Sequence, residues 1–381
     1  MIESGDIYKV VVAMTPLYVA LGLGYASVKW WRMFKPDQCD AINRFNCYFI
    51  IPFFTFQFTA GVNPYAMNFR FLAGDVIAKA ICGGALALWA NLGKKSKFSW
   101  AITSFSLSCF NNTLVVGVPL LKAMYGAAGE DLVVQSSVIQ SLIWFPILLF
   151  MLEFWRASCS DDYGVSDKEK PQPHIILANK HEVQENPNNT ITVVVDGSLN
   201  GAAIDSSTAV LSPSPSSNFG ATMKKVGGKL GKNPNCYACA LGVIWALVAK
   251  RWDFEMPSIV EGSILIMAKA GGGVAMFSMG LFMALQEKVI ACGMRLTIYG
   301  MVLRFVGGPL TTSIGSLTLG LRSNTLRIAI IQAALPQAIA SFVFAKEYDL
   351  HADVLSTSVI FGTVVSLPLL IVYYVVLDIM R

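Results

Sequence analysis

Long apolar runs separated by short polar connections occupy most of the chain, on either side of one extended polar segment. A helix needs about 20 consecutive apolar residues to cross a bilayer. Ten runs have that character, with ends placed to within about four residues, and they cover 7–28, 41–59, 69–92, 98–124, 131–155, 234–252, 258–285, 289–320, 324–347 and 353–379. The pattern predicts an all-α polytopic membrane protein with ten transmembrane helices.

The polar segment at 157–233 is rich in Ser, Asn, Pro and Gly and has no sustained hydrophobic period. Because it holds too few apolar groups to offset the entropy cost of ordering, we expect a disordered linker. The predicted organisation is a first five-helix repeat at 1–156, this loop, and a second five-helix repeat at 234–381.

Composition and charge support a membrane protein. The chain is 54% hydrophobic and only 14% charged, whereas a soluble domain carries about 25% charged residues. The net charge of +5 comes from Lys and Arg beside apolar runs, as in proteins whose basic residues flank membrane spans. We therefore expect the lipid bilayer as a partner and no nucleic acid.

The distribution of these basic residues predicts the orientation. Three lie in the first connection, 29–35, and none in the second, 62–68. The positive-inside rule then places both termini on the non-cytosolic side and the loop at 157–233 in the cytosol. Asn188 begins an Asn-Asn-Thr glycosylation sequon, which should stay unmodified on that side.

The two hydrophobic halves resemble each other. Ser-Val-Ile at 137–139 precedes Pro146, and Ser-Val-Ile at 358–360 precedes Pro368. Five spans is an odd number, so the second copy would enter the membrane from the opposite side. Such inverted repeats are a common transporter architecture.

The fourth and ninth runs hold prolines and amides at equivalent places: Asn112 and Pro119 in one, Pro336 and Gln337 in the other. Proline removes an amide donor and disturbs the preceding helical turn. A helix N-terminus at each break would present free N–H groups to an anion. We therefore expect crossed broken helices 4 and 9 to form the solute site.

Polar residues within other runs are candidates for supporting this site. Asp75 and Lys79 lie four residues apart on one helix face and could pair, either for structure alone or beside the substrate. Thr55 and Gln140 could support the site or could hydrogen-bond helices together.

No constellation for catalysis or metal binding can be assembled. Cys236 and Cys239 form a C-x-x-C at the start of a span, where a redox role would lack its thioredoxin-like unit. His174 and His181 lie in the polar loop, and His351 lies at a span end. We expect no enzyme activity, no cofactor and no metal.

Several motifs carry a family resemblance: Asn-Thr-Leu-Val-Val-Gly-Val-Pro at 112–119, Asn-Pro-Asn-Cys-Tyr at 233–237, Met-Phe-Ser-Met-Gly-Leu-Phe-Met-Ala-Leu-Gln at 276–286, Ala-Ala-Leu-Pro-Gln at 333–337 and Phe-Ala-Lys-Glu-Tyr at 344–348. The chain resembles the PIN-FORMED auxin efflux carriers of plants over both membrane halves. Its brief loop resembles that of the short-loop members, which typically reside in the endoplasmic reticulum membrane. Long-loop members act at the plasma membrane, which is the alternative location.

The resemblance implies a homodimer that carries indole-3-acetate by an elevator-like motion. Spans 1, 2, 6 and 7 would form a scaffold, and spans 3–5 and 8–10 a transport domain. The substrate-binding residues it implies are Asn112, Pro119 and Pro336 for the carboxylate, Ile51, Val115 and Ile339 for the indole ring, and Gln337. The support site it implies comprises Thr55, Asp75, Lys79 and Gln140. The chain departs from many members at 338–341, where they read Gly-Ile-Val-Pro, and from some at Phe145, where they carry Tyr.

The leading hypothesis is a uniporter that moves auxin from the cytosol into the reticulum lumen. One alternative is an ion-coupled organic-acid symporter of the bile-acid carrier type, although the acidic sodium-site cluster it would need is not evident. A second alternative is a membrane receptor or scaffold that signals through the 157–233 loop.

Overall fold

The computed structural model describes residues 4–91, 96–160, 219–286 and 290–379, and nearly all of them are helical. In the first half the elements are α1 (Ser4–Lys29), α2 (Pro36–Phe45), η1 (Asn46–Ile50), α3 (Ile51–Gly61), η2 (Pro64–Ala66), α4 (Phe69–Asn91), α5 (Ser96–Cys109), η3 (Thr113–Gly117), α6 (Val118–Tyr125), α7 (Ala127–Ile139), η4 (Gln140–Trp144) and α8 (Phe145–Ser160). Helix α9 (Phe219–Leu230) precedes the second half. The second half holds α10 (Pro234–Trp252), α11 (Ser258–Lys269), α12 (Gly271–Leu285), α13 (Met294–Val302), η5 (Leu303–Gly307), α14 (Gly308–Thr318), α15 (Ser323–Ala333), α16 (Ile339–Glu347) and α17 (Ala352–Ile379).

The predicted all-α character is confirmed in the described residues, and each predicted apolar run is helical over most of its length. Five helical stretches are long and apolar enough to cross a membrane: Gly5–Lys29, Phe69–Asn91, Ala127–Ala157, Ser258–Leu285 and Ala352–Ile379. Breaks divide several other runs into shorter helices. The chain is thus a multi-pass membrane protein, while ten crossings and an inverted repeat stay predictions.

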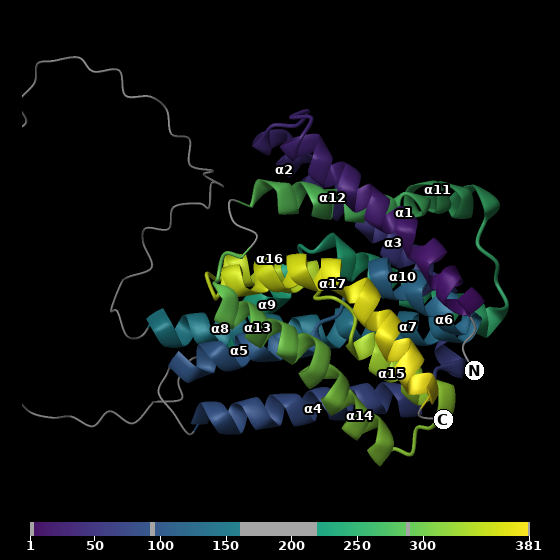
Figure 1. The fold of residues 1–381 in the computed structure, drawn as a ribbon. Helices are drawn as coiled ribbons and strands as arrows, with labels where there is room; N and C mark the ends of the chain where they lie inside the picture. Colours follow the sequence, from purple (N-terminus) through teal and green to yellow (C-terminus); the bar gives the residue numbers. More distant parts are fainter. Residues whose placement is uncertain (1–3, 92–95, 161–218, 287–289, 380–381) are drawn as a thin grey trace, which may run out of the picture.

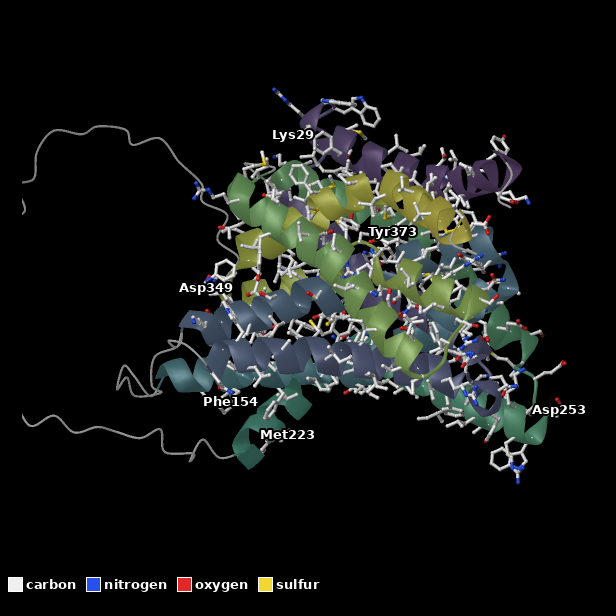
Figure 2. All side chains as sticks on the ribbon, turned by 60° about the horizontal axis from the view of Figure 1, so that its bottom comes forward. Lys29, Phe154, Met223, Asp253, Asp349 and Tyr373 are labelled. Atoms are coloured by element: carbon white, nitrogen blue, oxygen red, sulfur yellow. The ribbon has the colours of Figure 1, made fainter. Side chains whose placement is uncertain are left out.

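Large apolar side chains project from the outside of the helix bundle (Figure 2). More than half of the surface of each of the following is exposed: Leu88, Ile259, Ile266, Val302, Leu310 and Leu317. Soluble monomers rarely expose large contiguous apolar patches. A lipid environment accounts for this surface, in agreement with the hydrophobic pattern of the sequence.

The helices pack into two groups (Figure 1). In one, α1 lies along α12, and α3 packs against α10 and α11. In the other, α4 packs against α14 and α5, α6 against α7, and α14 against α15. The first group contains the segments that the family resemblance assigns to a scaffold, and the second contains those it assigns to a transport domain. The broken helices of the candidate site belong to the second group.

The expectation of a structureless linker is wrong at the end of that segment, because residues 219–230 form α9. Val226 on α9 is 3% exposed and joins an apolar cluster with Leu152 of α8 and Tyr348. The apolar stripe of α9 is too short to be recognised in the sequence among so many polar residues. Residues 161–218, including Asn188, lie outside the described residues.

Charged and polar groups fasten α9 to the second group. Lys229 Nζ lies 2.8 Å from Glu153 Oε1 and 2.9 Å from Glu347 Oε1, and it donates to Tyr348 Oη at 2.5 Å. Tyr348 Oη in turn donates to Glu153 Oε1 at 2.6 Å. We call these four residues the Lys229 cluster. The cluster joins α9 to α8 and to the end of α16. Phe154, Met223 and Asp349 lie at this same end of the molecule, opposite Asp253 (Figure 2).

We expect Lys229→Gln to loosen α9 without unfolding the protein. Ion pairs this close to solvent contribute about 0.2–1 kcal/mol each, so hydrogen exchange in 219–230 should accelerate several-fold. Lys232→Gln changes a solvent-exposed lysine just beyond α9 and serves as the control. Equal protection of α9 in both variants would contradict a role for the Lys229 cluster.

Candidate functional site

Two broken helices meet backbone to backbone inside the second group. Helix α5 ends at Cys109 and α15 ends at Ala333, and Asn111 and Gln337 then form an antiparallel bridge. The amide of Asn112 donates to the Pro336 carbonyl at 2.9 Å, and the amide of Ala338 donates to the Phe110 carbonyl at 3.1 Å. We call residues 110–112 and 336–338 the crossing. These bonds satisfy irregular backbone that lipid could not satisfy.

The two prolines that predicted the breaks have different places. Pro336 lies in the crossing, but Pro119 lies in the first turn of α6, seven residues beyond Asn112. Proline is tolerated at the start of a helix, because the amide it lacks has no intrahelical partner there. Asn112, rather than Pro119, therefore marks the first break.

Asn111, which sequence reasoning passed over, is held from both sides. The backbone N–H of Asn111 donates to Gln140 Oε1 at 3.1 Å, and Gln140 Nε2 donates to the backbone carbonyl of Asn111 at 2.7 Å. Its side-chain Nδ2 donates to the Gln332 carbonyl at 2.9 Å. The predicted support residue Gln140 thus holds the backbone of the crossing itself.

Arg304 of η5 is fully buried behind the crossing. Nη1 donates to the carbonyls of Leu107 and Phe110, each at 3.1 Å. Nη2 donates to the Ala333 carbonyl at 2.6 Å and to Asn111 Oδ1. The guanidinium therefore serves the last carbonyls of α5 and α15, which have no intrahelical partner. The signal in the sequence was an arginine in the middle of the apolar run 289–320, nine residues beyond Arg295, where an ionisable residue is costly and commonly functional.

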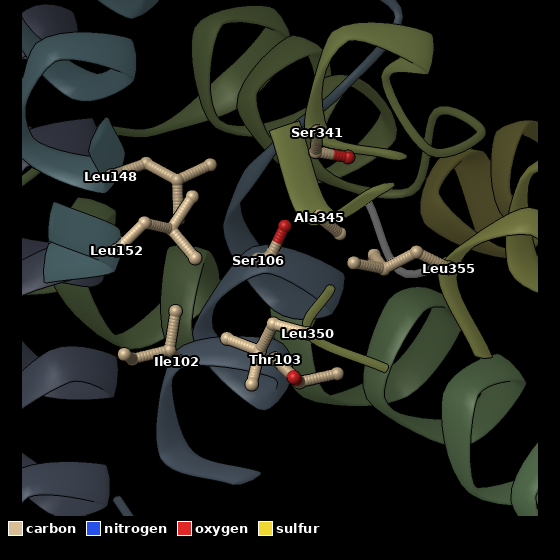
Figure 3. A pocket seen from close by; sticks show the side chains of 9 residues that line it. All are labelled: Ile102, Thr103, Ser106, Leu148, Leu152, Ser341, Ala345, Leu350 and Leu355. Atoms are coloured by element: carbon tan, nitrogen blue, oxygen red, sulfur yellow. The ribbon is translucent and has the colours of Figure 1, made fainter. Parts of the chain in front are cut away.

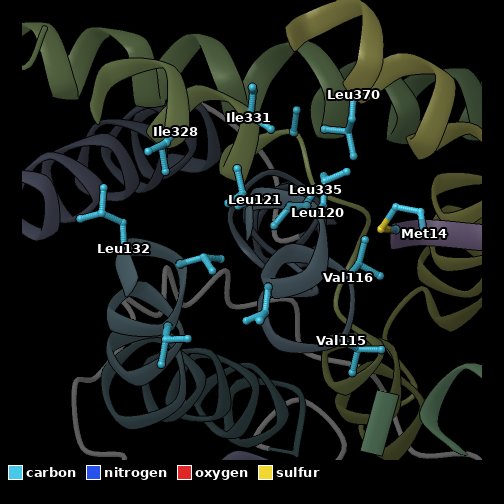
Figure 4. Packing of buried hydrophobic residues seen from close by; sticks show 14 of the residues in the cluster. Met14, Val115, Val116, Leu120, Leu121, Leu132, Ile328, Ile331, Leu335 and Leu370 are labelled. Carbon is cyan, nitrogen blue, oxygen red and sulfur yellow. The ribbon is translucent and has the colours of Figure 1, made fainter. Parts of the chain in front are cut away.

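Of the predicted substrate residues, Asn112, Pro336 and Gln337 lie in the crossing, and Val115 and Ile339 follow it closely in the chain. Asn112 Nδ2 is buried without a hydrogen-bond partner among the described residues, directly before the helical stretch Thr113–Tyr125. Val115 is buried, and Ile51 and Ile339 are partly buried against the same apolar cluster. Figure 4 shows Val115 and Val116 together with Met14 of α1 among the residues of this cluster. Asn112 thus offers an unused amide donor three residues before the buried Val115.

Gln337 is fully buried and is fixed by two bonds. Its Nε2 donates to the Ser106 carbonyl at 3.0 Å and to Ser341 Oγ at 2.6 Å. Its Oε1 is buried and has no hydrogen-bond partner in the part of the chain that the structure describes. Gln337 therefore ties α16 to the end of α5, and its amide nitrogen is already engaged.

The remaining support residues fall into two places. Asp75 and Lys79 pair on α4 at 2.8 Å, and Lys79 Nζ lies 5.2 Å from the ring centroid of Trp144 in η4. Thr55 donates instead to Asn235 Oδ1 on α10 at 2.5 Å. Within the described ranges, no hydrogen bond joins Thr55 to the Asp75–Lys79 pair.

Comparison of the sequence with known proteins places the chain in a family. Residues 9–374 match the family described as membrane transport protein. The chain is 54% identical over 378 residues to auxin efflux carrier component 5 of Arabidopsis thaliana, with 99% of both chains covered. The chain belongs to the PIN-FORMED auxin efflux carriers. It is also 52% identical over 383 residues to a probable component 5c of Oryza sativa subsp. japonica, covering 99% of each chain.

Within this family the chain is a short-loop member. Its alignment with a probable auxin efflux carrier component 1d of Oryza sativa subsp. japonica extends over 556 positions at 34% identity and covers 99% of this chain and 100% of the relative. The chain itself has 381 residues. The recognition made from the motifs is confirmed by these relatives.

Both departures from the expected PIN-FORMED pattern have a structural role. Ser341 Oγ accepts from Gln337 and donates to the Ala338 carbonyl at 2.7 Å, bonds that a proline could not make. The Phe145 ring stacks on Phe110 of the crossing with centroids 5.1 Å apart and meets Phe344 edge-on. In this carrier, the side chain at position 145 packs against two aromatic rings and carries no hydroxyl, which a tyrosine there would have.

A cavity of about 10 Å³ lies between α5, α8 and α16 (Figure 3). Ser106, Ser341 and Leu148 are among its lining residues, and no described residue forms a hydrogen bond with Ser106 Oγ. That volume suits about one water molecule, whereas small-molecule sites are commonly about 300–1,000 Å³. This cavity is therefore too small to hold an organic anion.

The other reactive side chains have local roles in this carrier. His351 Nδ1 lies 2.8 Å from Thr103 Oγ1, and its ring stacks on Trp100 at 4.0 Å. Cys236 and Cys239 are free thiols on α10. Across the ranges that the structure describes, His, Cys, Asp and Glu form no group suited to a metal ion.

Proposed function

We propose that this chain is an auxin carrier that moves the indole-3-acetate anion out of the cytosol, into the lumen of the endoplasmic reticulum. The observation that carries the proposal is the unpartnered Asn112 amide at the crossing of two broken helices, in a chain whose relatives are named auxin efflux carriers. The short loop supports the reticulum as the location.

The crossing offers what a small aromatic carboxylate requires. Asn112 Nδ2 would donate to the carboxylate, and the N-termini of Thr113–Tyr125 and of α16 would add free amide donors and positive dipole ends. Ile51, Val115 and Ile339 would contact the indole ring. Gln140 and Arg304 would hold the backbone in place, and the Asp75–Lys79 pair would support it from α4.

We further propose ten spans in two inverted five-helix repeats, with both termini on the non-cytosolic side. Helix α1 begins and α17 ends at the same end of the molecule, as an even number of crossings requires (Figure 1). The two broken segments meet in an antiparallel bridge. Opposite chain directions at equivalent breaks are what inverted repeats would produce.

Transport would proceed as an elevator-type uniport in a homodimer. The second helix group, which contains the crossing, would move against the first group. A potential of 100 mV acting on one negative charge is worth about 2.3 kcal/mol, or roughly 50-fold in concentration. No coupled ion is then needed to move an anion down its electrical gradient.

Uptake of labelled indole-3-acetate by proteoliposomes tests the function. We expect saturable uptake by the wild type, unchanged without sodium, and a fall of at least about tenfold in Asn112→Ala, because a hydrogen bond to a charged group is lost. Asn324→Ala, at an exposed position on α15, is the control and should transport normally.

The same assay separates the alternatives. Absence of uptake by the wild type would refute the carrier assignment, and normal uptake by Asn112→Ala would refute the assigned site. Strict sodium dependence would indicate an ion-coupled organic-acid symporter. A signalling receptor would transport no tested solute and would lose its function when the loop at 157–233 is deleted.

A further inference from the structure

Arg304 is a buried cation whose partners are carbonyl and amide oxygens. Arg304 is 0% exposed, and it donates to the carbonyls of Leu107, Phe110 and Ala333 and to the Oδ1 of Asn111. No carboxylate of the described residues forms an ion pair with it. Removing a cation from water costs several kcal/mol, so a charge at this position requires an explanation.

The acceptors have a common electrostatic character. Leu107 lies in the last turn of α5, Phe110 follows that helix, and Ala333 is the last residue of α15. A helix carries about −0.5 elementary charge at its C-terminus and about +0.5 at its N-terminus. Two C-termini therefore contribute about −1 at the crossing, which the single positive charge of Arg304 offsets.

Neutralising the C-termini leaves the opposite helix ends uncompensated. The stretch Thr113–Tyr125 and helix α16 both begin beside the crossing and would contribute about +0.5 each. Without Arg304 the four helix ends would nearly cancel. With Arg304 the crossing carries close to one net positive charge, which matches one carboxylate.

We propose that Arg304 is a positioning residue that makes the crossing selective for small monoanions over neutral molecules of the same shape. It acts by offsetting the two helix C-termini and by holding Asn111, the neighbour of Asn112, through Oδ1. This inference rests on the proposed function, since it takes the crossing as the auxin site. Arg304 itself need not touch the substrate.

Binding titrations on the purified full-length chain test the proposal, with indole-3-acetate as the anion and indole-3-acetamide as its neutral counterpart. In Arg304→Gln we expect affinity for the anion to fall about tenfold, because two helix C-termini at about 0.7 kcal/mol each are no longer offset. Affinity for the amide should change less than about threefold. Arg304→Lys keeps the charge and should keep most of the preference. Arg295→Gln, at an exposed position on α13, should change neither affinity.

The possible outcomes distinguish failure of this inference from failure of the proposed function. If the wild type binds no indole-3-acetate, both the proposed function and this inference are overturned. If the wild type binds it and Arg304→Gln keeps the same anion-to-amide ratio, the inference alone is overturned. If Arg304→Lys loses affinity for both ligands to the same extent, the role of Arg304 is purely structural. Where thermal melts show that Arg304→Gln is unfolded, the result with Arg304→Lys decides between the two roles.

Discussion

Replacing Lys79 with alanine is expected to destabilise the protein by about 3–5 kcal/mol, because Asp75 would stay buried without its partner. The two side chains pair at 2.8 Å on α4, where Asp75 is 9% exposed and Lys79 5%. The same change also removes the ammonium near the Trp144 ring. A thermal melt of the purified protein, followed by size-exclusion chromatography, would measure the loss.

A matched pair on the same protein supplies the control. Lys122 and Glu130 also lie 2.8 Å apart, but the Lys122 side chain is 61% exposed. Lys122→Ala should therefore cost about 0–1 kcal/mol. The double change Asp75→Leu with Lys79→Met should recover much of the stability, since no unpaired charge remains. Equal melting of Lys79→Ala and Lys122→Ala would contradict the buried character of the first pair.

Gly280→Val should prevent stable packing of α1 on α12. A Cβ atom at Gly280 would lie 2.1 Å from the Leu21 carbonyl oxygen and 2.7 Å from the Tyr25 amide nitrogen. These are backbone atoms, so only separation of the two helices could relieve the overlap. Overpacking commonly costs about 1–3 kcal/mol, and we expect this substitution to reach or exceed the upper figure.

The yield of monodisperse protein and its melting temperature would report the effect. Gly273→Val is the control on the same helix, because a Cβ atom there would meet nothing within 4 Å. Normal yield and melting of Gly280→Val would show that α1 and α12 do not approach as closely as described.

The hydrophobic pattern predicted the helical segments because apolar runs of span length leave the backbone few alternatives in lipid. The Asp75–Lys79 pair followed from local spacing alone. The crossing was located in the right runs, although the first break lies at Asn112 and not at Pro119. Proline indicates where a helix can begin as readily as where it ends, and the sequence offers no way to separate the two.

Contacts between distant parts of the chain escaped prediction. Arg304 reaches Asn111 across 193 positions of sequence, and no local period encodes such a contact. Helix α9 was also missed because the contacts that hold it in place, from Lys229 to Glu153 and Glu347, join residues that lie far apart in the chain. Thr55 was placed in the support site by resemblance, while its partner Asn235 belongs to α10.

The connection between α9 and α10 sets a length limit on any relative movement of the two helix groups. Only residues 231–233 separate Leu230 from Pro234, and four consecutive Cα–Cα steps extend to at most about 14 Å. While the Lys229 cluster holds α9 against α8 and α16, those helices cannot withdraw from the start of α10 by more than this reach. A larger displacement would require α9 to detach first. The breaking of the Lys229 cluster would therefore limit how far the second helix group can move relative to the first.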